Sequence, residues 1–167
     1  MRRRSFAIVA ALPLAACGVA EVQTFPTLAA VRGAIAALGA RDRSDGAWPL
    51  PMVLNHLAQS IEYSIDGYPE LKSALFRSAI GSVAFAVFEA RGKMGHSLSE
   101  PIPGAPALDA PAALEPAKSR LLAALQRFEA HEGELAPHFA YGALDKAQYT
   151  RAHLMHLANH WSEVRRT

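Results

Sequence analysis

Apolar residues recur every three or four positions through most of this chain. The repeat runs through residues 27–38, 49–65, 112–131 and 145–164. This spacing is typical of helices that bury one face. The sequence shows no β-branched runs and no alternation of apolar and polar residues, so we expect no strands. The pattern therefore predicts an all-α protein.

Several of these helices have recognisable ends. Gly39 ends the first helix, and Asp66 with Gly67 ends the second. The last helix begins at Asp145, whose side chain can cap the first turn. Gln148 stands three residues later, at the offset of a capping box.

Two further segments complete the predicted fold. Residues 70–90 are more uniformly apolar, and Gly81 at their centre leaves open a break into two pieces. Residues 92–111 form a long proline-rich connection, either a wall over a site or a rigid crossover between two helices. Four main helices around one core predict an antiparallel four-helix bundle with one long Pro-rich crossover, over residues 24–164.

The first 17 residues have the pattern of an export signal. Arg2, Arg3 and Arg4 precede an uncharged apolar run, residues 6–16, which is shorter than the roughly 20 residues of a membrane-spanning helix. Residues 14–17 resemble a bacterial lipobox, in which Cys17 would be lipidated, and residues 3–6 resemble a twin-arginine motif. Ordinary cleavage after Ala20 is the alternative. We expect export from a bacterial cytoplasm to the periplasm, with membrane attachment only through a lipid on Cys17.

The formal charge of +2 depends on these arginines. Without them, 14 of the 17 basic residues remain against 15 acidic ones, a balance of −1. Beyond Arg165 and Arg166 we find no basic cluster that would predict binding to nucleic acid. A phosphate-binding loop and a dinucleotide fingerprint are also absent from the sequence.

Cys17 is the only cysteine in the chain. A protein processed at this position has no disulfide, no thiolate metal ligand and no cysteine nucleophile in its folded part. Any metal must therefore be held by imidazole and oxygen ligands. Any thiol chemistry needs a thiol that the substrate brings.

Histidines are the most informative residues. His153, His156 and His160 share the apolar face of the last helix, and the last two have the i, i+4 spacing that lets two imidazoles bind one ion. Buried imidazoles need partners, either a metal ion or hydrogen bonds to carbonyl and carboxylate groups. A third ligand would come from another element, with His56 in the second helix as the first candidate and His138 as the alternative.

Two motifs together resemble the DinB/YfiT-like superfamily of four-helix-bundle metalloproteins. One is the segment Trp48–Leu57 with its single histidine, and the other is His156–His160. Residues 137–160 resemble uncharacterised branches of that superfamily. The resemblance covers residues 24–164. It implies that His56, His156 and His160 bind a divalent ion and leave coordination positions open.

The resemblance implies a thiol-dependent transferase or isomerase, and the chemistry of a metal site leads us to expect a metal-dependent transferase or hydrolase acting on a small molecule. Three neutral imidazoles suit zinc first, with nickel, manganese and iron as alternatives, and the ion would activate a bound water or thiol. Candidate contacts to the ligands or the substrate are His153, His138, Tyr63 and Tyr141. The sequence shows no convincing general-base carboxylate beside the histidines. The alternative is a non-catalytic envelope lipoprotein that binds metal or a protein partner. The oligomeric state stays open, with a dimer among the options.

Overall fold

The computed structural model describes residues 24–110 and 112–167, and these residues are mainly helical. The predicted export signal and the lipidation site at Cys17 lie outside the described residues. The elements in chain order are α1 (Leu28–Ala36), β1 (Arg43–Ser44), α2 (Leu50–Asp66), α3 (Ala74–Phe76), the π-helical turn η1 (Arg77–Gly81), α4 (Ser82–Arg91), α5 (Leu114–Ala130), α6 (Lys146–Trp161) and β2 (Val164–Arg165).

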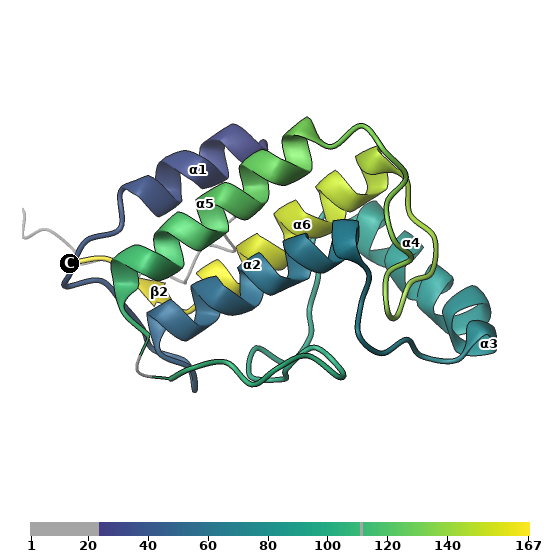
Figure 1. The fold of residues 1–167 in the computed structure, drawn as a ribbon, viewed down its shortest axis with the longest axis horizontal. Helices are drawn as coiled ribbons and strands as arrows, with labels where there is room; N and C mark the ends of the chain where they lie inside the picture. The colour runs from purple at the N-terminus through teal and green to yellow at the C-terminus, as the bar shows by residue number, and fades with distance from the viewer. Residues whose placement is uncertain (1–23, 111) are drawn as a thin grey trace, which may run out of the picture.

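Helices α1, α2, α5 and α6 lie side by side (Figure 1). Helices α2 and α1 each pack against both α5 and α6. The predicted antiparallel arrangement holds for α2 with α6 and for α1 with α5. Helices α2 and α5, however, run in the same direction, as Figure 1 shows. The reason is the long connection through α4 and residues 92–110, which returns the chain toward the end of the molecule where α2 begins (Figure 1).

The core of the described residues comes from the predicted apolar stripes. Its members are contributed by all four helices, and those on α2 lie on the face toward α5 and α6. The largest fully buried apolar side chains are Tyr149, Phe128, Ile35, Leu54, Leu57, Ile61, Leu121, Leu125 and Leu157. The helical periodicity therefore predicted the core correctly.

Helix α6 begins as predicted and ends earlier. The Asp145 side chain accepts a hydrogen bond from the Gln148 amide, and the Gln148 side chain accepts one from the Asp145 amide, so the capping box is present. The helix ends at Trp161, and Val164 belongs to β2, which pairs antiparallel with β1. The expectation of a helix to Val164 and of no strands was wrong here. Strands of two residues are too short to show an alternating pattern.

The segment predicted at residues 70–90 is helical only from Ala74, and it is not broken. Phe76, Gly81 and Ser82 all have right-handed helical backbone angles, so α3, η1 and α4 form one continuous run. A Cβ added to Gly81 would lie 1.8 Å from the carbonyl oxygen of Ala140. Gly81 therefore marks a close approach of two backbones and not a break.

One face of this helical run is both apolar and exposed. Leu75 is 77% exposed, and it shares this surface with Ile80, Val83 and Val87, whereas Phe85 points into the core. Burial therefore explains only some of the apolar residues in this segment, because others face solvent.

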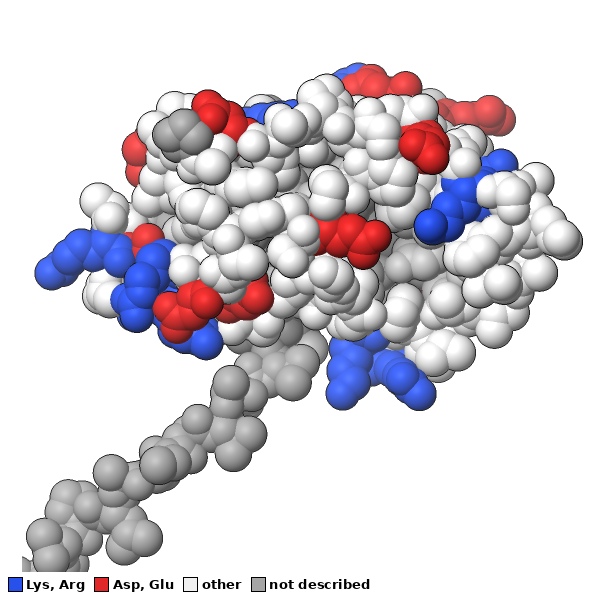
Figure 2. Space-filling model, turned by 90° about the horizontal axis from the view of Figure 1, so that it is seen from below, with Lys and Arg blue, Asp and Glu red and all other residues white. Residues whose placement is uncertain are grey.

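Among the described residues, no helix combines the length and hydropathy needed to cross a membrane. Seen from the side of the long connection, charged side chains lie in small separate groups (Figure 2).

We predict that Gly81→Ala destabilises the protein by about 1–3 kcal/mol, because the added methyl group displaces the backbone at Ala140. Gly33→Ala is the matched control, since Gly33 is also helical and an added Cβ there meets nothing within 4 Å. Alanine should stabilise that position slightly, as it does in ordinary helices. Urea unfolding of both variants measures the difference. Equal effects would contradict the close approach.

Candidate metal centre

Three histidines from two helices form one cluster. His56 lies on α2, and His156 and His160 lie one turn apart on α6. Each offers one ring nitrogen, and these nitrogens all lie within 4.8 Å of one another. The ring centroids are 5.2 Å apart for His56 and His156, 5.0 Å for His56 and His160, and 4.9 Å for His156 and His160. The structure therefore brings together the three residues that the sequence nominated.

These spacings suit a tetrahedral ion. An imidazole bound at about 2 Å places its ring centroid roughly 3 Å from the ion, so rings at tetrahedral angles stand about 5 Å apart. All three centroid distances are close to that value. Small rotations of the rings would bring the nitrogens to bonding distance. The donor set consists of neutral imidazoles, which suit zinc, nickel and iron.

Unpaired ring nitrogens point to a missing partner. His56 is 3% exposed and His160 is 1% exposed. Among the described residues, Nδ1 of His56 and both ring nitrogens of His160 are buried without a hydrogen-bond partner. Burying such a group without a partner costs about 1–3 kcal/mol. An ion bound by His56, His156 and His160 would satisfy one nitrogen of each ring.

Burial keeps these imidazoles neutral. It lowers the pKa of His56 to about 4, with a further contribution from the charge of His96. Burial likewise lowers the pKa of His160 to about 2, and it holds the pKa of His156 well below its usual value. At neutral pH all three rings therefore carry a free lone pair, which is the form that binds metal.

Local structure holds the two helices together at this end. Trp48, just before α2, packs against His56 with ring centroids 5.1 Å apart. The pairing of β1 with β2 connects the segment before α2 to the residues after α6. The Asp45 amide also donates to the Glu163 carbonyl oxygen at 2.9 Å. The start of α2 and the end of α6 are therefore fixed beside each other.

His153 is part of the histidine stripe but has a protein partner. Its Nε2 lies 3.3 Å from Oγ of Ser64, and the Ser64 hydroxyl donates to the Ile61 carbonyl oxygen at 2.6 Å. The Ser64 oxygen therefore accepts a hydrogen bond from His153. Burial lowers the pKa of His153 to about 3. For this histidine, the structure favours the interpretation of a hydrogen-bonded core residue, and it lies outside the three-histidine cluster.

His138, the alternative third ligand, also lies outside the cluster. Its Nδ1 accepts hydrogen bonds from the backbone amides of Ala140 at 3.1 Å and Tyr141 at 3.2 Å. This nitrogen therefore carries no proton, and the neutral ring must carry its proton on Nε2. Gly142 closes the turn with a φ of +85°, and the Tyr141 ring stacks on the His138 ring at 4.2 Å. The turn fixes His138 as a hydrogen-bond donor.

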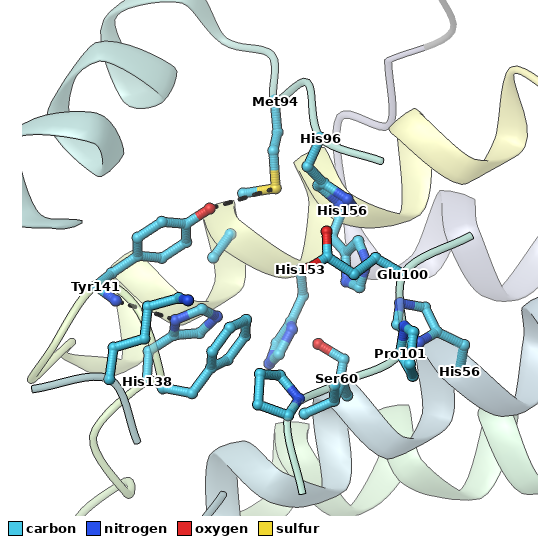
Figure 3. A pocket seen from close by; sticks show the side chains of 15 residues that line it. His56, Ser60, Met94, His96, Glu100, Pro101, His138, Tyr141, His153 and His156 are labelled. Atoms are coloured by element: carbon cyan, nitrogen blue, oxygen red, sulfur yellow. Dashed lines mark hydrogen bonds between the residues drawn. The ribbon is translucent and has the colours of Figure 1, made fainter. Parts of the chain in front are cut away.

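A cavity of about 200 Å³ joins these groups. His56 and His156 line one part of it, and His138 and Tyr141 line another (Figure 3). Lys72 also lines the cavity. Of the candidate contacts, His138, His153 and Tyr141 reach the cavity, whereas Tyr63 packs against Tyr68 and is not among its lining residues. The cavity therefore adjoins the histidine cluster through His56 and His156.

Three charged or ionisable residues of this cavity, Lys72, His96 and Glu100, were not predicted from the sequence. His96 and Glu100 lie on the long connection after α4 (Figure 3). Candidates were nominated by their position on helix faces or in the turn before the last helix, and residues of the long connection have neither position. The available signal was the proline-rich connection, which was interpreted as either a wall over a site or a crossover. Residues of the connection do line the cavity.

Comparison with known proteins places the chain in a family. It belongs to the family described as "Protein of unknown function (DUF1569)", whose sequence profile matches residues 20–167. The match includes all three clustered histidines and the cavity. Searches of curated proteins and of solved structures find no match. The family assignment supports an uncharacterised domain family and names no reaction.

We predict that the metal-free protein loses stability as the pH falls from about 6.5 to about 3. Unfolded histidines take up protons below about 6.5, whereas burial holds the pKa values of His138 and His153 at about 3 in the folded state. The unfolded state therefore binds more protons throughout this window. His153→Gln should reduce the slope by up to about 1.4 kcal/mol per pH unit. Urea unfolding at several pH values tests this, and identical slopes would contradict it.

Proposed function

We propose that His56, His156 and His160 hold a divalent transition-metal ion and that the protein uses it on a small molecule in the adjoining cavity. The observation that carries this proposal is the set of three imidazoles about 5 Å apart, of which two have buried nitrogens without a protein partner. Zinc suits three imidazoles best, with nickel, manganese and iron as the other options.

A bound ion would supply Lewis acidity and lower the pKa of a water or thiol ligand. The protein's own residues would orient the substrate. His138 presents its Nε2 proton as a fixed donor for a carbonyl or carboxylate oxygen, and Lys72 adds a positive charge at the same cavity. Since Cys17 is the only cysteine, a thiol nucleophile would come from the substrate. We propose transfer to a thiol or hydrolysis as the reaction.

We also propose that α1, α2, α5 and α6 form a four-helix bundle of the DinB type. Each of these helices contacts two of the others, and the helices that carry the ligands are the second and the last of the four. The parallel pairs α2 with α5 and α1 with α6 are compatible with such a bundle, because one long crossover between the second and third of the four helices makes both of these neighbouring pairs parallel. A crystal structure compared with DinB-like bundles would test this assignment.

The alternative is an envelope protein that binds metal without a reaction. It uses the same three histidines, so metal binding does not separate the two functions. The cavity with its fixed donor at His138 favours the enzyme. Incubation of the zinc-loaded protein with low-molecular-weight thiols and electrophilic or ester substrates would separate them. Turnover that His138→Ala diminishes supports the enzyme.

We predict that the purified protein binds about one equivalent of Zn²⁺. His156→Ala should weaken the zinc affinity by more than about 100-fold. Loss of a residue that only hydrogen-bonds to a metal ligand already weakens the affinity about 10–100-fold. Elemental analysis and chelator competition measure these quantities. Less than about a tenth of an equivalent of any transition metal after reconstitution would contradict the proposal.

His153→Ala is the matched control for this experiment. His153 is a buried histidine on the same helix, but its partner is Ser64. The control variant should lose stability and keep its metal affinity, whereas His156→Ala should lose the affinity. Equal losses of affinity in the two variants would show that the effect comes from disturbed packing and not from a lost ligand.

We propose export and lipidation at Cys17 as the localisation. In a bacterial host treated with globomycin, which blocks cleavage of lipoprotein precursors, the full-length precursor should accumulate. Cys17→Ala should remove this accumulation, because the variant has no thiol to lipidate. Immunoblotting of both proteins measures precursor and mature forms. Processing of the wild type unaffected by globomycin would support ordinary cleavage after Ala20.

A further inference from the structure

A fourth histidine, His96, stands beside the three-histidine cluster (Figure 3). Its ring centroid lies 4.9 Å from that of His156 and 5.6 Å from that of His160. The first distance equals the 4.9 Å between the rings of His156 and His160 themselves. The His96 ring is therefore as close to the His156 ring as the His160 ring is.

The hydrogen bond of His96 uses Nδ1 and leaves Nε2 free to bind an ion. Nδ1 lies 2.7 Å from the carbonyl oxygen of Ser97. A carbonyl oxygen only accepts, so Nδ1 carries the proton and Nε2 of the neutral ring has a lone pair. Histidines that bind metals commonly donate one N–H to a carbonyl group and coordinate through the other nitrogen. His96 has this arrangement.

The loop that carries His96 is anchored on both sides. Before it, Met94 packs against the core and its sulfur accepts a hydrogen bond from the Tyr141 hydroxyl at 4.0 Å. After it, Ile102 is buried, and the Gln59 side chain donates to the Pro106 carbonyl oxygen at 3.3 Å. Between these anchors His96 is exposed, and it follows Gly95. The loop therefore holds His96 near the cluster, and the exposed ring is not enclosed by its neighbours.

We propose that His96 is the fourth ligand of the ion, and this inference rests on the proposed metal site. Its nitrogens lie outside the group that is mutually within 4.8 Å, so coordination requires an inward rotation of the ring. The resting site would then hold four imidazoles. A substrate would gain its coordination position by displacing His96, and the long connection between α4 and α5 would control access to the ion.

Glu100 competes for the same position. Its carboxylate lines the cavity on the same loop, near His96 and His156 (Figure 3). Oxygen and imidazole ligands scatter differently in X-ray absorption spectra, because an imidazole ring contributes outer-shell signals that a carboxylate lacks. The number of bound imidazoles therefore distinguishes the two candidates.

Zinc K-edge X-ray absorption on the zinc-loaded protein tests the proposal. The wild type and Glu100→Gln should show four imidazoles, and His96→Ala should show three with one oxygen. His131→Ala is the matched control, because His131 is another histidine whose ring bonds to a backbone carbonyl, that of Glu134. It should keep four. Chelator competition should show an affinity loss of about 10–100-fold only in His96→Ala.

Exogenous imidazole provides a second measurement on the cobalt-loaded protein. In His96→Ala, added imidazole should bind at millimolar concentrations and restore the visible spectrum of the wild type, whose own spectrum should not change. Three imidazoles in the zinc-loaded wild type would overturn the role of His96 and leave the metal site intact. Failure of the wild type to bind zinc at all would overturn both.

Discussion

Burial of imidazole rings between α2 and α6 is the constraint on which the rest of this structure depends. His56 and His160 have nitrogens that no described group satisfies, in a region where polar groups are costly to leave unpaired. A partner that lies between the two helices would recover this cost. A cation that several lone pairs share meets this requirement better than a single hydrogen bond, because it serves all three rings at once.

The surrounding elements can be understood as support for that interface. The strands β1 and β2 join the beginning of α2 to the end of α6, at the end where His56 and His160 meet. At the other end of α6, the turn around His138 packs against Gly81, whose lack of a side chain lets the backbones approach. The helical run of α3 and α4 therefore positions the turn, and the turn orients a hydrogen-bond donor toward the cavity.

Residues on helices were predictable because a helix repeats. His156 and His160 were nominated by their spacing of four, and the capping box at Asp145 by its offset of three. His96 was not predictable in this way, since its position depends on contacts of Met94 and Ile102 that are distant in sequence from α6. The strand pair was missed because pairing of Ser44 with Val164 joins segments at opposite ends of the domain. Likewise, the position of the proton on His138 depends on the geometry of a turn, and amino-acid composition does not specify that geometry.

The low proton affinity of the buried rings has a consequence for how an ion would be taken up and kept. Burial depresses the pKa of His56 to about 4 and that of His160 to about 2, so no proton has to leave these rings when an ion arrives at neutral pH. These rings should then add nothing to the buffer dependence of the heat of metal loading. Retention should also persist in mildly acidic surroundings, at pH values where exposed histidines would exchange a bound ion for protons.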